Sequence, residues 1–355
     1  MTTAVPATGP GAGESCPPVR AVRQRTFVFA AATVLVLLFM VLNVRIGSVS
    51  YSGGQVLHAI LHPDASDNLT FIVWKIRMPR AIAAVLGGAF LAVSGLLMQV
   101  YFRNPIVGPF ILGISSGATV MVSVVMLTTV GLGFAYFSPF LNTLAACIGA
   151  YAVMAMVVAV AVRVRNGVTL LIVGLMMGYL CGAATAILTA LAEKEQIKGF
   201  VLWQLGSFSG FKWAEIGVLV GFGGFLLACI YLLSKPLNAF LLGEDYAASM
   251  GVNIRRFRIL ILLFASSLAG LVTAMAGPVA FIGLAVPHMA RLSLGTSDNR
   301  ILVPGACLMG GLVTSMCDLI ARNTLSPVEL PLSAITAFFG APVVIGLLLK
   351  RGTKS

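Results

Sequence analysis

The stretch WKIRMPRAIAAVLGGAFLAVSGLLMQVYFRNP, residues 74–105, decides the fold. Its apolar part, from Ala81 to Tyr101, has about the 20 residues that a helix needs to cross a hydrocarbon core. Arg77 and Arg80 stand at the entrance of this run, with a proline between them. Acidic residues are favoured at a helix start, because the backbone dipole is positive there. Two arginines at a predicted helix start therefore require an explanation.

The composition places the chain in a membrane. Of the 355 residues, 59% are hydrophobic and 10% are charged, and the mean hydropathy is +1.02. Soluble domains carry about 25% charged residues, so the chain is predicted to be an integral membrane protein. Its long apolar runs favour an all-α fold over a barrel, whose strands would alternate over about 10 residues.

Ten apolar segments predict ten transmembrane helices. The segment 279–292 is short for a full crossing, and a tilted or re-entrant segment surrounded by protein would also fit. With the N-terminus in the cytoplasm, most of the 23 lysines and arginines fall on the inner side, in agreement with the positive-inside bias. Both termini are then cytoplasmic, whereas nine spans would separate them. The predicted spans are residues 26–46, 80–101, 108–127, 138–162, 168–191, 215–234, 258–277, 279–292, 303–322 and 333–349.

The ends of the chain are predicted to be tails. Residues 1–25, with Pro, Gly and Ser, indicate a disordered cytoplasmic tail without the features of a removable signal peptide. Residues 26–350 form the ten-helix domain, and 351–355 a second cytoplasmic tail. The net charge of +12 is explained by topology rather than by nucleic-acid binding. Six scattered cysteines and three unclustered histidines predict buried thiols and no metal site.

The chain contains no evident energy source. It has no G-x-x-x-x-G-K-[ST] sequence, so it binds no nucleotide through a Walker motif. An ion-coupled carrier needs ionisable groups near mid-membrane, but the eleven acidic residues fall in loops or near span ends. Asp318 is the deepest, and the i+4 position of Arg322 favours a local ion pair over a proton relay. The energy for transport is therefore expected to come from a partner.

One inner loop offers a landing site for that partner. KPLNAFLLGEDYAASMGVNIRRFR, residues 235–258, is the longest inner connection after the N-terminal tail. Acidic residues suit the first helical turn and glycine suits a left-handed helix stop, so a short helix is expected over residues 244–250, with Asn253 capping the next helix. An ordinary interfacial linker is equally consistent with these residues. The expected signals are Glu244, Asp245 and Gly251, and the expected contact residues are Ala247, Ala248 and Met250.

Together these stretches resemble the FecCD-like permeases of type II ABC importers, which carry iron–siderophore complexes, haem or cobalamin. The resemblance extends from about Arg77 to Lys350 and rests on RMPRAIAAVLGGAFLAVSGLLMQ, RNPIVGPFILGISSGA, LLGEDYAASMGV with AGPVAFIGLAVPHMAR, and ARNTLSPVELPLSAITAFFGAPVVIGLLLK. It implies a ten-helix subunit with two related helix sets. It also implies a homodimer, with the path between the two copies, two ATPase subunits below and an extracytoplasmic substrate-binding protein above.

The resemblance assigns roles to particular residues. In the family, arginines at the outer mouth pair with glutamates of the binding protein, and Arg77, Arg80 and Arg322 match these positions; snorkelling toward headgroups is the structural alternative. The fifth span is implied to line the path through Met176, Met177 and Tyr179, although methionines in such a helix usually only pack. The segment that couples to the ATPase comprises Gly243, Glu244, Asp245, Ala247, Ala248, Met250 and Gly251.

The predicted function is the permease subunit of an importer in the bacterial cytoplasmic membrane. No cofactor is expected on this chain, because the resemblance implies that ATP and magnesium bind to the partner ATPase. An iron chelate, siderophore or haem, is the favoured cargo, and cobalamin is the alternative. Pro331-Leu332-Ser333 departs from a frequent family pattern and makes the cargo less certain. An ion-coupled secondary transporter is less favoured, and a membrane enzyme is last.

Overall fold

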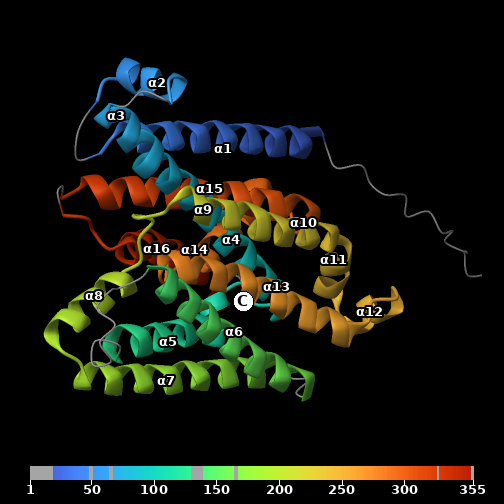
Figure 1. Cartoon of the computed structure of the whole chain (residues 1–355). Helices are drawn as coiled ribbons and strands as arrows, with labels where there is room; N and C mark the ends of the chain where they lie inside the picture. The colour runs from blue at the N-terminus through green and yellow to red at the C-terminus, as the bar shows by residue number, and fades with distance from the viewer. Residues whose placement is uncertain are drawn as a thin grey trace, which may run out of the picture.

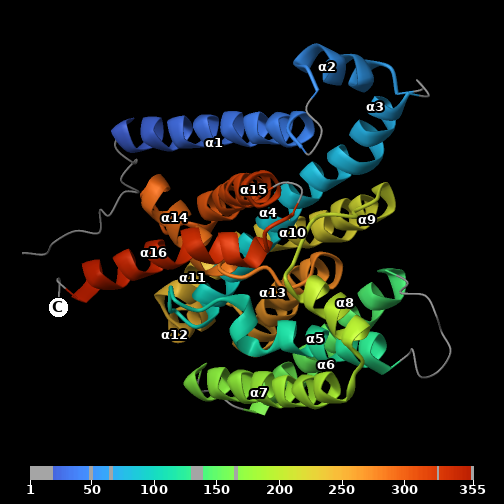
Figure 2. The same ribbon diagram turned by 90° about the vertical axis from the view of Figure 1, so that its left-hand side faces the viewer.

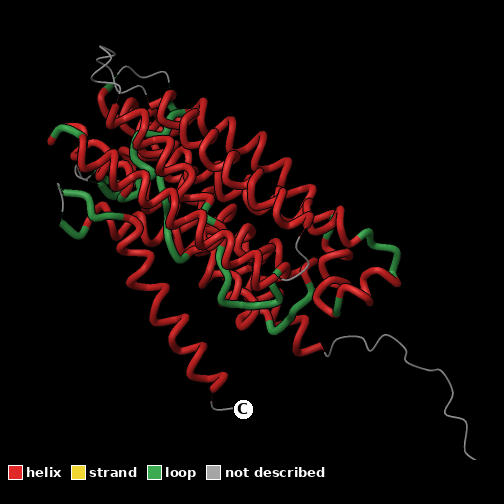
Figure 3. The backbone as a smooth tube through the Cα atoms, turned by 90° about the horizontal axis from the view of Figure 1, so that it is seen from below, coloured by secondary structure: helices red, strands yellow, loops and turns green. Residues whose placement is uncertain are grey.

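The computed structural model describes residues 19–47, 51–63, 67–128, 139–163, 167–325 and 328–352. Within these residues every regular element is a helix (Figures 1 and 3). The all-α prediction is therefore confirmed for the part of the chain that the structure describes. Helix α1 lies along one edge of the molecule and α7 along the opposite edge, as Figures 1 and 2 both show.

Each of the ten predicted segments coincides with a helix. The helices are α1 (Val19–Arg45), α4 (Met78–Tyr101), α5 (Ile114–Thr128), α6 (Pro139–Arg163), α7 (Gly167–Leu191), α9 (Trp213–Val218) continuing into α10 (Gly224–Leu232), α13 (Ile254–Ala276), α14 (Ile282–Leu294), α15 (Asn299–Asn323) and α16 (Leu332–Gly352). Shorter helices connect them: α2 (Gly53–Leu61), α3 (Asn68–Phe71), α8 (Lys194–Gln204), α11 (Ser234–Leu242) and α12 (Glu244–Ser249).

Seven helices among the described residues are long and apolar enough to cross a membrane. Two shorter apolar helices, Ile114–Thr128 and Leu332–Gly346, accompany them. Helix α14 has 13 residues, a length of about 20 Å, against a hydrocarbon core of about 30 Å. The number of complete crossings and the side on which each terminus lies stay predictions.

Helix α4 is the centre of the packing. Twenty of its 24 residues are buried, and Leu91, Leu96 and Met98 are inaccessible to solvent. Glycines let it approach its neighbours closely: a Cβ atom on Gly88 would lie 2.3 Å from the carbonyl oxygen of Gly310 on α15. Small residues at such contacts are how membrane helices associate, so the small-residue stripe of this span is a packing feature.

The helix that contains the opening stretch starts earlier than predicted. Helix α3, a π-helical segment Ile72–Arg77 and α4 form one continuous helix, Asn68–Tyr101. Asp67 is its N-cap, and its carboxylate accepts a hydrogen bond from the Thr70 backbone N–H at 3.1 Å. The acidic residue expected at a helix start is thus present, ten residues upstream of Arg77. The prediction that Arg77 and Arg80 oppose a helix dipole is wrong, because they lie inside the helix.

The boundary of the N-terminal tail is also different. Helix α1 begins at Val19, so residues 19–25 are helical rather than part of a tail. Gln24 and Arg25 donate hydrogen bonds to the backbone oxygens of Ser293 and Leu294, each at 3.3 Å. These contacts at the end of α14 extend the helix beyond its apolar run. Residues 1–18 and 353–355 of the predicted tails lie outside the described residues.

Two related glycine–proline segments interrupt the helices. GPFILG ends at Gly113 with φ of 75°, and GPVAFIG starts at Gly277 with φ of 74°. Both glycines hold left-handed backbone that L-residues avoid. The two segments meet, since a Cβ atom on Gly283 would lie 2.7 Å from Cδ of Pro109. The left-handed glycine stands at the end of the first segment and at the start of the second, so the two segments are not equivalent, and the relation between two helix sets stays a prediction.

We expect Gly88→Ala to destabilise the fold, because its new methyl group meets the backbone oxygen of Gly310 and forces α4 and α15 apart. The cost should be about 1–3 kcal/mol of unfolding free energy, as is typical of overpacking. Gly217→Ala is the matched control, since nothing lies within 4 Å of a Cβ atom there. Thermal unfolding in detergent measures both, and equal stability of the two variants would contradict the close crossing.

Candidate functional site

Arg80 is the centre of a buried charged cluster. Its Nε and Nη2 atoms donate to the two oxygens of Asp318 on α15, at 3.1 and 3.0 Å. Its Nη1 and Nη2 atoms donate to the oxygens of Glu329 at 2.6 and 3.1 Å. Paired hydrogen bonds between a guanidinium and a carboxylate combine charge with fixed geometry. One side chain of α4 therefore holds two acidic residues that come from the end of α15 and from the turn before α16.

The predicted ion pair between Asp318 and Arg322 is wrong. Asp318 is 1% exposed and is paired with Arg80 across the α4–α15 contact. The i+4 spacing made Arg322 a possible neighbour, but the side chain of Arg322 is used elsewhere. The deepest acid of the chain is thus part of an interhelical pair.

Arg77 and Arg322 both bind the C-terminal end of α1. Arg77 donates through Nη1 to the backbone oxygens of Val44 and Arg45, at 3.0 and 2.8 Å. Arg322 donates through Nη2 to those of Asn43 and Ile46, at 2.7 and 2.6 Å.

These four carbonyl groups are the ones that α1 cannot satisfy itself. The last four carbonyls of a helix have no intrahelical partner, and the dipole makes this end negative. The guanidinium groups therefore cap α1 with matching charge. This is the structural reason for two of the three arginines that the sequence singled out.

The structure brings the three predicted docking arginines together and buries them. Arg77, Arg80 and Arg322 are 5%, 6% and 7% exposed. Arg322 lies within electrostatic range of the other two arginines and of Asp318 and Glu329. Glu329 is the accessible member, with 41% of its side chain exposed. Docking of a partner at these arginines stays a prediction. A docked partner would have to contact side chains whose hydrogen bonds already join α1, α4 and α15.

The second predicted site, the short helix of the inner loop, forms as expected. Helix α12 covers Glu244–Ser249 with both acidic residues in its first turn. Gly251 has φ of 83°, the left-handed stop, and the Asn253 side chain accepts from the Arg256 N–H and caps α13. Arg258 binds both oxygens of Glu244, at 2.5 and 2.7 Å. This pair ties the start of α12 to α13.

The exposed face of α12 differs from the predicted one. Ala247 is completely buried, so the expectation that it is available for contact is wrong. Asp245 and Ala248 are exposed, and Met250 is 64% exposed. Tyr246, which the sequence analysis left out, is 47% exposed. Adjacent residues of a helix lie about 100° apart around its axis, so Tyr246 can be exposed although its neighbour Ala247 is buried.

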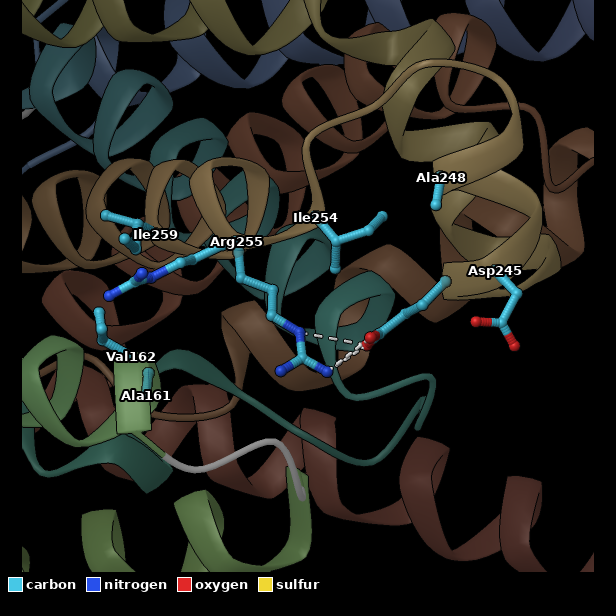
Figure 4. A pocket seen from close by; sticks show the side chains of 9 residues that line it. Ala161, Val162, Asp245, Ala248, Ile254, Arg255 and Ile259 are labelled. Carbon is cyan, nitrogen blue, oxygen red and sulfur yellow. Dashed lines mark hydrogen bonds and ion pairs between the residues drawn. The ribbon is translucent and has the colours of Figure 1, made fainter.

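A pocket of about 450 Å³ lies at the foot of α12. Figure 4 shows Asp245 and Ala248 on the α12 side and Ala161 and Val162 at the end of α6. Arg255 extends from the first turn of α13 toward Val162, whereas Arg258 pairs with Glu244. The pocket thus adjoins the exposed face of the short helix and adds a cationic side chain to it.

The predicted pathway helix α7 is largely exposed. Met176 and Tyr179 are 50% and 66% exposed, while Met177 is partly buried against the core. A pocket of about 430 Å³ lies further along, between α5, α7 and α8. The sequence analysis missed its residues, which are mostly small or hydroxylated and give no motif; they are Ser115, Ser116, Thr119, Gly182, Thr185, Ala186, Thr189, Phe200, Val201, Gln204 and Pro278.

No group of three or more His, Cys, Asp or Glu side chains that could hold a metal ion occurs among the described residues. The described cysteines are free thiols; Cys181 and Cys317 are buried and the other three are half-buried. No ligand set for a bound metal ion is therefore evident in this part of the chain.

The arrangement of helices and the sequence both match a known family. Residues 35–350 match the FecCD transport family. The chain belongs to this family. It is 34% identical over 322 residues to the hemin transport system permease protein HmuU of Yersinia pestis, covering 89% of this chain and 94% of HmuU. It is 33% identical over 338 residues to the vitamin B12 import system permease protein BtuC of Yersinia pseudotuberculosis, covering 94% and 96%.

The solved structures agree with this membership. A metal-chelate type ABC transporter in an inward-facing conformation superimposes with a TM-score of 0.78 at 26% identity, over 92% of this chain and 99% of that one. The chain is thus a multi-pass FecCD permease of the bacterial ABC importer class, located in the cytoplasmic membrane. PsaBC from Streptococcus pneumoniae shares the fold alone, with a TM-score of 0.51 at 12% identity.

We expect Asp318→Asn to lower the free energy of unfolding by about 3 kcal/mol or more, because breaking a buried ion pair leaves an uncompensated charge. Glu329→Gln is the matched control on the same guanidinium, and its cost should be about 1 kcal/mol or less since this carboxylate is accessible. Thermal unfolding of the two purified variants measures the difference. Equal losses would show that Asp318 is not the buried anchor.

Proposed function

We propose that this chain is the permease subunit of an ATP-driven importer that moves an iron chelate, a siderophore complex or haem, into the cytoplasm. The observation that carries the proposal is the full-length similarity to the hemin permease HmuU. The similarity to a metal-chelate type transporter supports the same class of cargo. Cobalamin is the second candidate, favoured by an almost equal identity to BtuC over a longer alignment.

The proposed topology has ten crossings and both termini in the cytoplasm. Helices at all ten predicted positions support it, as does the excess of basic residues on the predicted inner side. Helix α14 is too short to cross alone. Its inner residues Ile282, Val286, Ala290 and Leu294 are buried against the rest of the molecule, so protein can surround a partial crossing.

Two copies of the ATPase are proposed to bind below the membrane, each at one α12. The support is local: Glu244 and Arg258 fix the helix, and Gly243 and Gly251 end it on both sides with positive φ. Asp245, Tyr246, Ala248 and Met250 then form a protruding face. In Figure 1 this element extends beyond the main body of helices. ATP and magnesium belong to the partner, and no cofactor is assigned to this chain.

A homodimer with the path between its copies is proposed from the exposed apolar helices. Tyr179, Leu180 and Ile187 on α7 are 63–66% exposed. Phe338 on α16 is 75% exposed, and α16 extends away from the bundle in Figure 3. Contiguous apolar surface of this kind packs against lipid or against a second subunit. The hydroxyl-rich pocket beside α7 would then open toward the path, together with Met176, Met177 and Tyr179.

The outer partner is proposed to be a substrate-binding protein that docks over Arg77, Arg80 and Arg322. Their three guanidinium charges against two carboxylates leave the cluster with one net positive charge. An acidic patch on the partner would complement it. Because the cluster also holds α1, α4 and α15 together, docking there would contact three helices at once.

The importer is tested with this chain coexpressed with its neighbouring ATPase and placed in nanodiscs. We expect the ATPase to copurify and to hydrolyse ATP faster when the binding protein is added, and haem, ferric siderophore or cobalamin to be taken up according to the true cargo. Ala248→Arg should abolish copurification by placing a charge on the exposed face of α12. Ala214→Arg, an exposed alanine on α9, is the control. Transport driven by an ion gradient without any ATPase would overturn the proposal.

Arg77→Gln tests the docking site. We expect it to weaken binding of the substrate-binding protein about tenfold, because a hydrogen bond to a charged group contributes about 1.5–3 kcal/mol. Arg45→Gln removes an exposed positive charge at the same end and should change the affinity less than about twofold. ATPase copurification serves as the folding control. Unchanged affinity of Arg77→Gln would contradict the assignment of Arg77.

A further inference from the structure

The two carboxylates on Arg80 differ in one property, their access to solvent. Asp318 is 1% exposed and lies near the end of α15, where it is paired with Arg80 of α4. The Glu329 side chain is 41% exposed and comes from the turn between α15 and α16. A buried carboxylate cannot leave its partner without a large desolvation cost, whereas an accessible one can exchange its partner for water. Glu329 is therefore the carboxylate that can leave Arg80 and be replaced by another partner.

The turn that carries Glu329 does not depend on its side chain. The Leu330 N–H donates to the Ala321 carbonyl oxygen, and the Val328 N–H donates to that of Leu325, both at 2.9 Å. The first bond holds Leu330 to the last turns of α15, and the second holds Val328 to Leu325, two residues beyond that helix. The carboxylate can thus move away from Arg80 while the backbone stays in place.

The other two arginines are less able to exchange partners. Arg77 and Arg322 are bound to backbone carbonyls at the end of α1. Releasing them would leave those buried carbonyls unsatisfied. Arg322 nonetheless has spare capacity, since its buried Nε atom has no hydrogen-bond partner among the described residues. A carboxylate that arrived beside Arg80 would meet this unused donor and the net positive charge of the cluster.

We propose that Glu329 occupies, in the isolated chain, the place on Arg80 that a carboxylate of the substrate-binding protein takes on docking. The inference rests on the proposed function, because it takes the outer partner to be an acidic binding protein. The exchange replaces one carboxylate by another, so Arg80 is never left unpaired and Asp318 keeps it in position. Glu329 then acts as an internal competitor that weakens docking.

The competition has a measurable consequence. When Glu329 occupies Arg80 in part of the population, only the remaining molecules can bind the partner. The apparent affinity is then the intrinsic affinity multiplied by the fraction of molecules that can bind. Removing the competing charge raises that fraction and leaves the cluster with one more net positive charge. Association with an acidic partner should then become tighter and more dependent on salt.

Glu329→Gln in the complete transporter, with its ATPase in nanodiscs, tests this by titration with the binding protein at two salt concentrations. We expect the affinity to rise at least about fivefold at low salt, with a steeper loss at high salt. Glu195→Gln is the matched control, since it removes an exposed negative charge on the same predicted side, at the start of α8. Its affinity should change less than about twofold.

If the Glu329→Gln transporter keeps its ATPase and its thermal stability but binds the binding protein no more tightly than the wild type, the proposal that Glu329 is an internal competitor is overturned. An equal gain in Glu195→Gln would also overturn it, since the effect would then be general electrostatics. If Glu329→Gln does not fold, Glu329→Ala, which also removes the carboxylate, is measured in its place and is expected to show the same rise. A wild-type transporter that copurifies with its ATPase but never binds the binding protein would reject the docking assignment itself.

Discussion

The four terminal carbonyl groups of α1, which have no partner within the helix, are the constraint on which this region of the structure depends. The contacts to the Val44 and Asn43 carbonyls are buried, and a buried carbonyl group without a partner costs free energy comparable to a lost hydrogen bond. Arg77 from α4 and Arg322 from α15 supply the donors. Their charge must in turn be tolerated in a buried place, and Asp318 and Glu329 on Arg80 compensate most of it. Capping α1 and joining it to α4 and α15 are thus one interaction.

The same cluster is one of the features by which a subunit without its own nucleotide-binding motif could respond to partners. This FecCD permease has no Walker motif, and its deepest acid serves an interhelical pair rather than a proton path. The two regions proposed to contact partners lie at separate ends of the packed helices; they are the arginine cluster and the protruding α12. Between them α4 and α15 cross closely at glycines, and dense packing of this kind transmits displacement instead of absorbing it.

Local signals predicted local structure well. The apolar runs located a helix at each of the ten positions, and the acidic first turn, Gly251 and Asn253 defined both ends of α12 and the start of α13. Predictions of helix boundaries were wrong where a helix extends beyond its apolar run. Helix α1 extends back to Val19 through polar contacts with α14, and the helix containing α4 extends back to Asn68 through a π-helical segment. Hydropathy is insensitive to such extensions.

By itself the sequence determined the membrane class, the positions of the ten apolar helices, the short helix of the inner loop and the resemblance to its family, because these follow from composition, spacing and motif order. Only the tertiary structure decided which charges meet. Asp318 lies four residues from Arg322 along the helix, yet it binds Arg80, 238 residues away. The reason is that a buried ion pair is selected by three-dimensional proximity and by the competing need of α1 for donors. Spacing along one helix describes neither.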